Sequence, residues 1–364
     1  MRTSEEHDVI AKGEPSNDVS TGAGHANNTT TNTCSESTVA LPRTANKAYS
    51  SHGGAYYVGD SVRLLKSKPF ERLQGKVQLI LTSPPYPLNK KKAYGNLTGN
   101  AYVEWIESLA PVFSSLLAED GSLVIELGNS WEPERPVQSL LALKALMALA
   151  TSEGTGLRLI QQFICHNPSR LPSPAAWVTI KHIRAVDSFT HVWWLAKSDY
   201  PKANNQNVLR PYSKSMEQLL RRGRYNHGSR PSEHRVSETS FLKDRGGSIA
   251  QSVFEIEPII PGTTTRLPNA FSYSNTGSND FFHKACKEQG MTPHPARMPL
   301  GMASYFIEFL TDKDDLVLDP FGGSNTTGYA AARAGRRWIA IDAKQEYADQ
   351  SRLRFDDPAL NKKA

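Results

Sequence analysis

Cysteine is scarce in this chain of 364 residues, which contains only Cys34, Cys165 and Cys286. Three widely spaced cysteines provide neither a disulfide framework nor the paired ligands of a zinc site. We therefore expect no metal centre. A reducing compartment, the cytoplasm, fits this cysteine content best.

Long apolar runs are also absent. The most apolar stretch, residues 137–150, is interrupted by Gln138, Ser139 and Lys144, and it is shorter than the ~20 residues of a membrane-spanning helix. The polar N-terminus lacks the apolar core of a secretory signal, so we expect no membrane association. With 38% hydrophobic and 21% charged residues, the chain is not wholly disordered. Its length suits one large α/β domain or about two to three smaller ones.

The positive net charge of the chain is confined to one segment, and the rest of the chain is neutral overall. The whole sequence carries +6 at pH 7. Residues 197–247 hold eleven basic and five acidic side chains, so this segment accounts for the entire excess. A basic segment is typical of proteins that bind a polyanion, although a solvated basic loop without a partner would look the same.

The N-terminal residues differ in composition from the rest. Between Ser16 and Thr38, eighteen of twenty-three residues are Ser, Thr, Asn, Gly or Ala. Such a stretch buries too little apolar surface to offset the entropy lost on ordering. We therefore predict a disordered tail over residues 1–54.

Beyond the tail, short apolar runs alternate with segments of helical periodicity. Strands are predicted at 55–58, 77–81, 123–127, 159–165, 189–195, 316–318 and 338–341, and helices at 101–118, 137–149, 298–310, 325–334 and 344–353. This alternation predicts a parallel sheet covered on both faces. Binding sites in such sheets lie beyond the carboxyl ends of the strands.

Residues 316–328 read as a strand, a glycine turn and a helix start. Gly322 and Gly323 let the backbone approach a ligand closely, and Asn325 can cap the helix. Asp342 ends the next predicted strand, nineteen residues after Gly323, where a carboxylate can accept hydrogen bonds from a ribose diol. Neither G-x-G-x-x-G nor G-x-x-x-x-G-K-[ST] is present, so S-adenosylmethionine is favoured over NAD or ATP. A glycine turn without a ligand is the alternative.

A second loop, Thr82-Ser83-Pro84-Pro85-Tyr86, follows the strand predicted at 77–81. Two consecutive prolines fix the backbone and lack N–H donors, whereas their carbonyl groups remain as acceptors. Ser83 adds a hydroxyl group and Tyr86 a flat ring. Acceptors beside a stacking face suit an exocyclic amine. A Pro-Pro turn alone is common, so this interpretation depends on its pairing with the glycine turn.

These motifs, in this order, resemble the amino-methyltransferases of DNA, and among them the cytosine-N4 methyltransferases. The resemblance covers roughly residues 55 to 355. The matching runs are TSPPY at 82–86, KKAYGN at 91–96, NPSRLPSP at 167–174, VWW at 192–194, PYS at 211–213, RPS at 230–232, GGSI at 246–249, HPAR at 294–297 and FGGSNTTG at 321–328.

The resemblance implies an α/β fold, a Rossmann-like seven-stranded sheet in which the catalytic motif precedes the cofactor motif. It makes Ser83, Pro84, Pro85 and Tyr86 catalytic. Glu126 departs from the family pattern, because an aspartate is expected there. The implied pocket for S-adenosylmethionine contains Asp60, Pro295, Asp319, Phe321, Gly322, Gly323, Ser324, Asn325, Thr326 and Asp342.

The same resemblance divides the chain into parts and assigns contacts with double-stranded DNA. The basic segment is expected to be the target-recognition segment, inserted between two halves of the catalytic domain. The expected parts are the tail 1–54, the catalytic half 55–196, the recognition segment 197–265, the cofactor half 266–355 and a C-terminal tail 356–364. The expected DNA contacts are Lys90, Lys91, Lys92, Arg221, Arg222, Arg224, Arg230 and Arg235.

The implied function is transfer of a methyl group from S-adenosylmethionine to N4 of a cytosine flipped out of duplex DNA. None of the three cysteines lies in a Pro-Cys motif, which argues against methylation of carbon 5. Ser83 favours cytosine over the alternative, adenine-N6 methylation; a catalytically silent DNA-binding protein is a third hypothesis. A cognate restriction endonuclease and a location at the prokaryotic nucleoid are further expectations.

Overall fold

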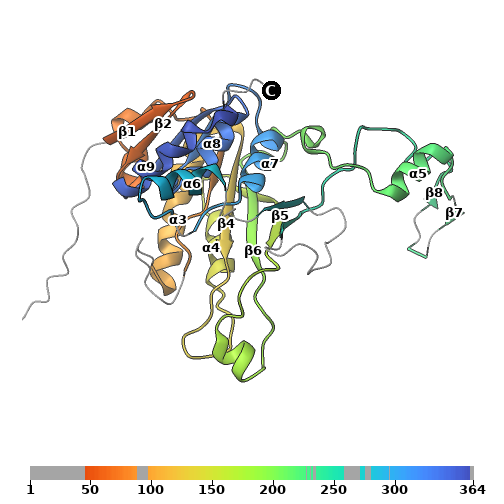
Figure 1. Cartoon of the computed structure of the whole chain (residues 1–364), viewed down its shortest axis with the longest axis horizontal. Coiled ribbons are helices and arrows are strands. Elements are labelled where there is room, and N and C mark those ends of the chain that lie inside the picture. Colours follow the sequence, from red (N-terminus) through yellow and green to blue (C-terminus); the bar gives the residue numbers. More distant parts are fainter. Residues whose placement is uncertain are drawn as a thin grey trace, which may run out of the picture. The chain divides into compact units, whose positions relative to one another are not determined.

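A computed structural model describes residues 46–87, 97–226, 228–229, 231–232, 235–257, 271–274, 280–294 and 296–360. Figure 1 shows its helices and strands. The strands are β1 Asn46–Ser51, β2 Gly54–Val58, β3 Val77–Thr82, β4 Leu117–Gly128, β5 Arg158–His166, β6 Phe189–Ala196, β7 Gly228–Ser229, β8 Arg235–Val236, β9 Val253–Glu257, β10 Phe271–Ser274, β11 Leu316–Asp319 and β12 Arg337–Asp342.

The α-helices are α1 Ser61–Leu65, α2 Lys68–Glu71, α3 Gly99–Leu116, α4 Leu141–Ala150, α5 Lys214–Arg222, α6 Phe281–Glu288, α7 Leu300–Leu310, α8 Thr326–Arg333 and α9 Gln345–Arg352. A π-helical turn, η1, spans Ala176–Ile180, and 3-10 turns span η2 Asn205–Val208, η3 Leu353–Asp356 and η4 Pro358–Leu360. None of the helices in these described ranges is long and apolar enough to cross a bilayer.

The main sheet has the strand order β1-β2-β12-β11-β3-β4-β6-β5-β9-β10. Its seven central strands, from β2 to β5 in this order, are those predicted from the apolar runs. The expected α/β fold is thus confirmed. The edge strands β1, β9 and β10 carry weaker apolar signals and were not predicted.

The expected parallel sheet has an exception at β6, which pairs antiparallel with both β4 and β5. The physical reason lies in the connection from β5 to β6, residues 167–188, in which the only helical turn is η1. A parallel return needs a crossover that covers one face of the sheet. Without a crossover helix, β6 runs back beside β5, and its first residues lie at the carboxyl ends of the other strands.

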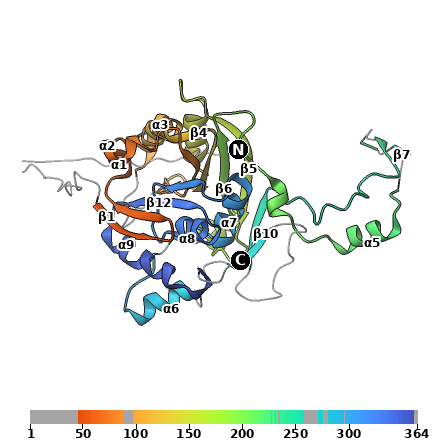
Figure 2. The ribbon, with the colours of Figure 1, turned by 90° about the horizontal axis from the view of Figure 1, so that it is seen from above.

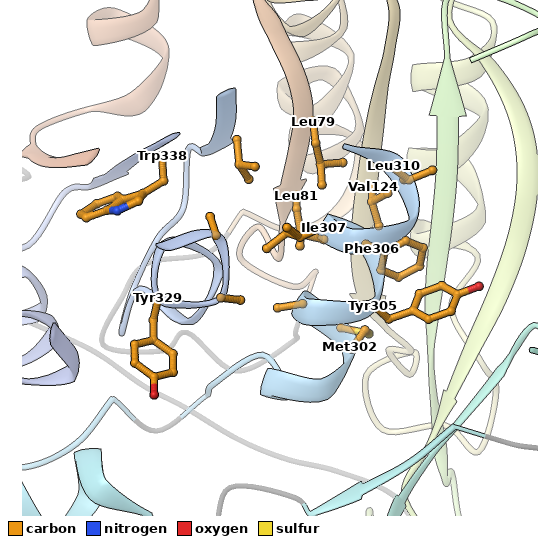
Figure 3. Packing of buried hydrophobic residues seen from close by; sticks show 14 of the residues in the cluster. Leu79, Leu81, Val124, Met302, Tyr305, Phe306, Ile307, Leu310, Tyr329 and Trp338 are labelled. Carbon is orange, nitrogen blue, oxygen red and sulfur yellow. The ribbon is translucent and has the colours of Figure 1, made fainter. Parts of the chain in front are cut away.

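Alternating side chains of the central strands build a hydrophobic core on each face of the sheet. Leu79 and Leu81 pack with residues of α7 and α8 on one face, as Figure 3 shows. Ile80 packs with residues of α3 and α4 on the other. Trp193 and Trp194 divide between these two cores, as expected for neighbours on a strand. Figure 2 shows α1, α2 and α3 on one side of the strands and α7, α8 and α9 on the other.

The predicted inner boundaries of the two tails, at residues 54 and 356, need correction. Residues 1–45 and 361–364 lie outside the described residues. Strand β1 begins before residue 54 and pairs antiparallel with β2. Its Tyr49 is buried and contacts the hydroxyl of Ser351 over 2.7 Å. At the other end, Leu360 packs against the core and Tyr329 donates a hydrogen bond to Asp357. Residues 46–51 and 356–360 therefore belong to the folded body.

The basic insertion is shorter than the predicted range 197–265, because its first residues belong to the body of the protein. Lys202 forms ion pairs with Asp312 and Asp315, and Val208 is buried in the core, so residues 197–210 belong to the body. Arg210 and Ser248 then exchange two backbone hydrogen bonds of 2.8 Å. Residues 211–247, hereafter the inserted segment, leave and re-enter the body at this bridge; residues 258–265 lie outside the described part.

Candidate functional site

A cavity of about 490 Å³ opens at the carboxyl ends of the central strands. It lies where loops after β2, β3, β5, β11 and β12 meet the end of β4 and the first residues of β6. Its lining residues are Asp60, Ser61, Ser83, Pro84, Pro85, Tyr86, Glu126, Cys165, Asn167, Arg170, Thr190, His294, Ala296, Arg297, Met298, Pro299, Asp319, Phe321, Gly322, Gly323, Ser324, Thr326, Thr327, Asp342, Ala343 and Tyr347. The Ser-Pro-Pro-Tyr loop and the glycine turn, far apart in sequence, therefore share one cavity.

Asp319, the last residue of β11, connects these two loops. Its Oδ1 accepts hydrogen bonds from Thr82 Oγ1 at 2.7 Å and from the backbone N–H of Phe321 at 3.1 Å. Its Oδ2 accepts one from Thr327 Oγ1 at 2.7 Å. Burial raises the pKa of Asp319 to about 6, against the lowering effect of these donors. The carboxyl group thus holds the turn in place.

The glycine turn has a backbone conformation that favours glycine. Gly323 has φ of +46°, in the left-handed region. Its carbonyl accepts a hydrogen bond from the hydroxyl of Tyr56 at 2.9 Å, and its N–H donates to Asp342 Oδ2 at 3.0 Å. Asp342 Oδ1 also accepts from the N–H of Lys344 at 3.1 Å. Burial raises the pKa of Asp342, and its carboxyl group lies at the cavity wall.

Asn325 is the one expected cofactor residue, among those described, that does not line the cavity. It is fully buried, and its Oδ1 caps α8 by accepting from the N–H of Gly328 at 3.0 Å. Its Nδ2 donates to the hydroxyl of Tyr49 at 3.0 Å, away from the turn. The neighbouring Ser324 carbonyl accepts from the buried Arg354. Asn325 therefore shapes the turn from behind.

On the other side of the cavity, Tyr86 packs against the end of β4. A side chain at Gly128 would come within 2.6 Å of its ring, so glycine is required for this packing. Ser83 Oγ lies 3.4 Å from the Tyr86 hydroxyl oxygen. Burial, with nearby Glu126, raises the pKa of Tyr86, so this hydroxyl group keeps its proton.

Glu126 is a cavity residue that the predicted site omitted. It lies near the end of β4, is 7% exposed, and accepts a hydrogen bond from Thr190 Oγ1 at 3.0 Å. Burial raises the pKa of Glu126, whereas hydrogen bonds from Thr190, Tyr86 and Ser83 lower it. Its position near the end of an expected strand was the available signal. No sequence signal marked Thr190, because the antiparallel course of β6 brings it here.

Arg170 is a second omitted residue at this end of the cavity. Its Nη1 donates to the carbonyl oxygens of Phe189 at 2.9 Å and Asp187 at 3.3 Å, and to Asp187 Oδ2 at 3.4 Å. Asp187 Oδ1 in turn accepts from Asn129 Nδ2 at 2.9 Å. The arginine of the NPSRLPSP run is thus attached to the start of β6.

Apart from Asn325, the predicted site residues lie in the cavity, on the inserted segment or outside the described residues. Ser83 to Tyr86 and the expected cofactor residues other than Asn325 and Pro295 line the cavity. Arg221, Arg222, Arg224 and Arg235 are exposed on the inserted segment. Lys90, Lys91, Lys92, Arg230 and Pro295 lie outside the described residues. Within the described ranges, no group of three or more His, Cys, Asp or Glu side chains could hold a metal ion.

Known proteins are similar to this chain both in sequence and in fold. A family model for N6/N4 methyltransferases, described as DNA methylase, matches residues 77–353. The type II methyltransferase M.PvuII of Proteus hauseri is 39% identical over 312 residues, 85% of this chain and 86% of that protein. The type II methyltransferase M2.MboI of Moraxella bovis is 44% identical over 71 residues, 20% of this chain and 25% of its own.

A solved structure agrees with these sequence matches. The PvuII DNA methyltransferase (cytosine-N4-specific) superposes with a TM-score of 0.65 and 32% identity, over 88% of this chain and 98% of that one. The family model alone spans most of the chain, including both loops of the cavity. The protein therefore belongs to the DNA methylase family of N6/N4 amino-methyltransferases.

Proposed function

We propose that this protein transfers a methyl group from S-adenosylmethionine to N4 of a cytosine that is flipped out of duplex DNA. One observation carries the proposal: the Ser-Pro-Pro-Tyr loop and the glycine turn line a single cavity. Methyl transfer requires a donor and an amine held side by side, and positioning supplies much of the rate in such reactions.

The cavity wall formed by β2, β11 and β12 suits the cofactor. Carboxylates of Asp60 and Asp342 and the ring of Phe321 line it, beside the backbone of Gly322 and Gly323. Carboxylates can accept from a ribose diol and an adenine amine, and aromatic rings and carboxylates both attract a cation. S-adenosylmethionine, when bound, supplies an electrophilic methyl group on a positively charged sulfur.

The opposite wall, formed by the ends of β3, β4 and β5 and the start of β6, suits the base. The lone pair of an exocyclic amine is delocalised into its ring, so the amine is a poor nucleophile. Hydrogen bonds from its N–H groups to Ser83 Oγ and the Pro84 carbonyl draw the nitrogen toward tetrahedral geometry. Tyr86 offers a ring against which an extruded base stacks.

Cytosine is favoured over adenine as the target. The relative M.PvuII, in its solved structure, is named as cytosine-N4-specific, and Ser83 stands where adenine enzymes usually carry an acid or its amide. The intact Ser-Pro-Pro-Tyr loop and glycine turn also argue against a silent DNA-binding protein.

The inserted segment, residues 211–247, is our proposed reader of the DNA sequence. It carries eight basic and four acidic residues, and its described arginines are exposed. Basic side chains contact phosphates and guanine edges. M.PvuII is named as a type II methyltransferase, which supports a role beside a restriction endonuclease with the same target, at the bacterial nucleoid in the cytoplasm.

The test is to identify the modified base. The purified protein is incubated with unmethylated genomic DNA and S-adenosylmethionine, and the DNA is digested to nucleosides for mass spectrometry. We expect N4-methylcytosine, and far less of it with the Ser83→Ala variant. N6-methyladenine as the sole product would contradict the cytosine assignment, and no methylated nucleoside at all would contradict the enzymatic function.

A further inference from the structure

We propose that Arg170 recognises the 2-oxo group of the target cytosine and thereby separates cytosine from adenine. The inference rests on the proposed function, because it concerns the base bound in the same cavity. Arg170 lines this cavity together with Ser83, Glu126 and Thr190.

The guanidinium group of Arg170 is fixed by one of its amino groups. All three of its hydrogen bonds, to Asp187 and Phe189, start at Nη1. Because a guanidinium group is planar and has five N–H donors, this attachment orients the donors on Nε and Nη2 while leaving them for a ligand.

A network of side-chain hydrogen bonds keeps the anchor of Arg170 in place. Asn129 donates to Asp187, and Asn129 Oδ1 accepts from Gln138 at 3.0 Å. His191 Nε2 lies 2.9 Å from the same oxygen. Since Oδ1 is an acceptor, this nitrogen carries the proton. Gln138 and His191 therefore hold Asn129, Asn129 holds Asp187, and Asp187 holds Arg170.

Other polar groups of the described cavity are engaged elsewhere, so Arg170 is the cationic donor at the wall proposed for the base. Thr190 donates its hydroxyl to Glu126, and Asn167 Oδ1 accepts from the N–H of Ser169. Arg297, the other arginine among the described lining residues, pairs with Asp280 at 3.3 Å. Arg170 forms its ion pair with Asp187 at 3.4 Å rather than with Glu126.

The edge of cytosine requires such a donor. It presents the N4 amine as a donor, then N3 and the 2-oxo group as acceptors. Ser83 Oγ and the Pro84 carbonyl accept from the amine, so the acceptors at the far end of the edge need an N–H. Adenine presents an amine and one ring nitrogen, followed by C2–H. Adenine would thus leave a desolvated arginine donor without a partner, which sites of this kind reject strongly.

The test combines a variant with a changed base. Two duplexes are compared, one with the target cytosine and one with a 2-aminopyridin-5-yl C-nucleoside in its place. This analogue keeps the amine and the adjacent ring nitrogen but has no 2-oxo group. The assay is run at a pH where the aminopyridine is neutral. We measure kcat/KM for the wild type, Arg170→Gln, and the control Arg158→Gln, which removes an exposed arginine paired with Asp199.

On cytosine, Arg170→Gln should lower kcat/KM by about tenfold to hundredfold, the usual cost of one specific base contact. The wild type should lose a similar factor on the analogue, and Arg170→Gln should lose no more there. Arg158→Gln should behave as the wild type on both.

If the variant and the analogue effects multiply, Arg170 does not contact the 2-oxo group, and its role is to hold the start of β6. A wild type that methylates neither duplex would contradict the proposed function, and this role of Arg170 with it. Cytosine methylation with multiplying effects would contradict only the role of Arg170.

Discussion

Thr82 Oγ1 donates a hydrogen bond of 2.7 Å to Asp319 Oδ1, although 237 residues separate them in sequence. Thr82 directly precedes the Ser-Pro-Pro-Tyr loop, and Asp319 directly precedes the glycine turn. The two neighbouring strands β3 and β11 bring them together. This hydrogen bond sets the spacing between the part of the cavity that we propose for the base and the part that we propose for the cofactor.

Breaking this hydrogen bond should affect both stability and catalysis. Thr82→Val keeps the shape of the side chain but removes the donor from a buried carboxyl group, at a cost of about 2 kcal/mol. We expect a lower Tm and a reduced kcat/KM. The control is Thr151→Val, which removes an exposed hydroxyl bonded to the Met147 carbonyl. Equal effects of the two variants would show that the contact between strands has no special role.

The same aspartate predicts a dependence of stability on pH. Burial raises the pKa of Asp319 from 3.8 to about 6, so the folded state favours the protonated form. Its contribution to stability is fully present below the unfolded pKa and is lost as the pH rises through about 6; a shift of about two units corresponds to roughly 3 kcal/mol. Asp319→Asn removes this dependence, so its Tm relative to the wild type should rise between about pH 4 and pH 7. A Tm difference that stays constant over this pH range would contradict the assignment.

Ser83 and Gly323 should separate chemistry from cofactor binding. Ser83→Ala removes an acceptor for the amine, so we expect most methyl transfer to be lost while S-adenosylmethionine binds normally by calorimetry. The control Ser108→Ala changes an exposed serine of α3. A wild-type rate for Ser83→Ala would exclude a catalytic role.

Gly323→Val should do the reverse of Ser83→Ala and abolish cofactor binding. The reason is backbone strain, because φ is +46°, whereas a Cβ atom would meet His294 only at an ordinary 3.4 Å. Undiminished binding of S-adenosylmethionine by this variant would show that the turn tolerates a β-branched residue.

Two truncations distinguish the tail from β1. Removal of residues 1–44 should leave methylation unchanged, because their composition cannot form a core. Removal of residues 1–52 also deletes β1 and Tyr49, which contacts Asn325 and Ser351. This second truncation should lower Tm and weaken cofactor binding. A large loss of activity after the shorter truncation would show that the tail takes part in binding or folding.

The arginines of the inserted segment should divide into two groups on alanine substitution. A phosphate contact weakens binding to all duplexes and lowers the salt slope by about one unit, whereas a base contact costs roughly 1–3 kcal/mol at one position of the target. Arg221, Arg222, Arg224 and Arg235 are the described candidates, with cofactor affinity unchanged in each. If all four variants bind specific and nonspecific DNA as the wild type does at several salt concentrations, this segment takes no part in recognising the target.

The sequence predicted the elements that local patterns encode. Apolar runs mark β3, β11 and β12, and prolines and glycines mark the two loops beside them. Pairing across the sheet has no such local signal. Glu126 and Thr190 meet only because β6 runs antiparallel to β4, and Asn325 points toward Tyr49 because β1, which was not predicted, supplies that hydroxyl.

The bridge between Arg210 and Ser248 has an implication for how such enzymes diversify. The two backbone hydrogen bonds close the inserted segment at its base, and Tyr212 and Asp244 add a side-chain bond of 3.0 Å just beyond it. Among the described residues from 211 to 247, no strand belongs to the main sheet. A segment closed in this way can be exchanged for one of another length and sequence, as a graft, while the rest of the protein keeps its register. On our proposal that this segment reads the DNA sequence, new specificities can arise by replacement of this segment alone.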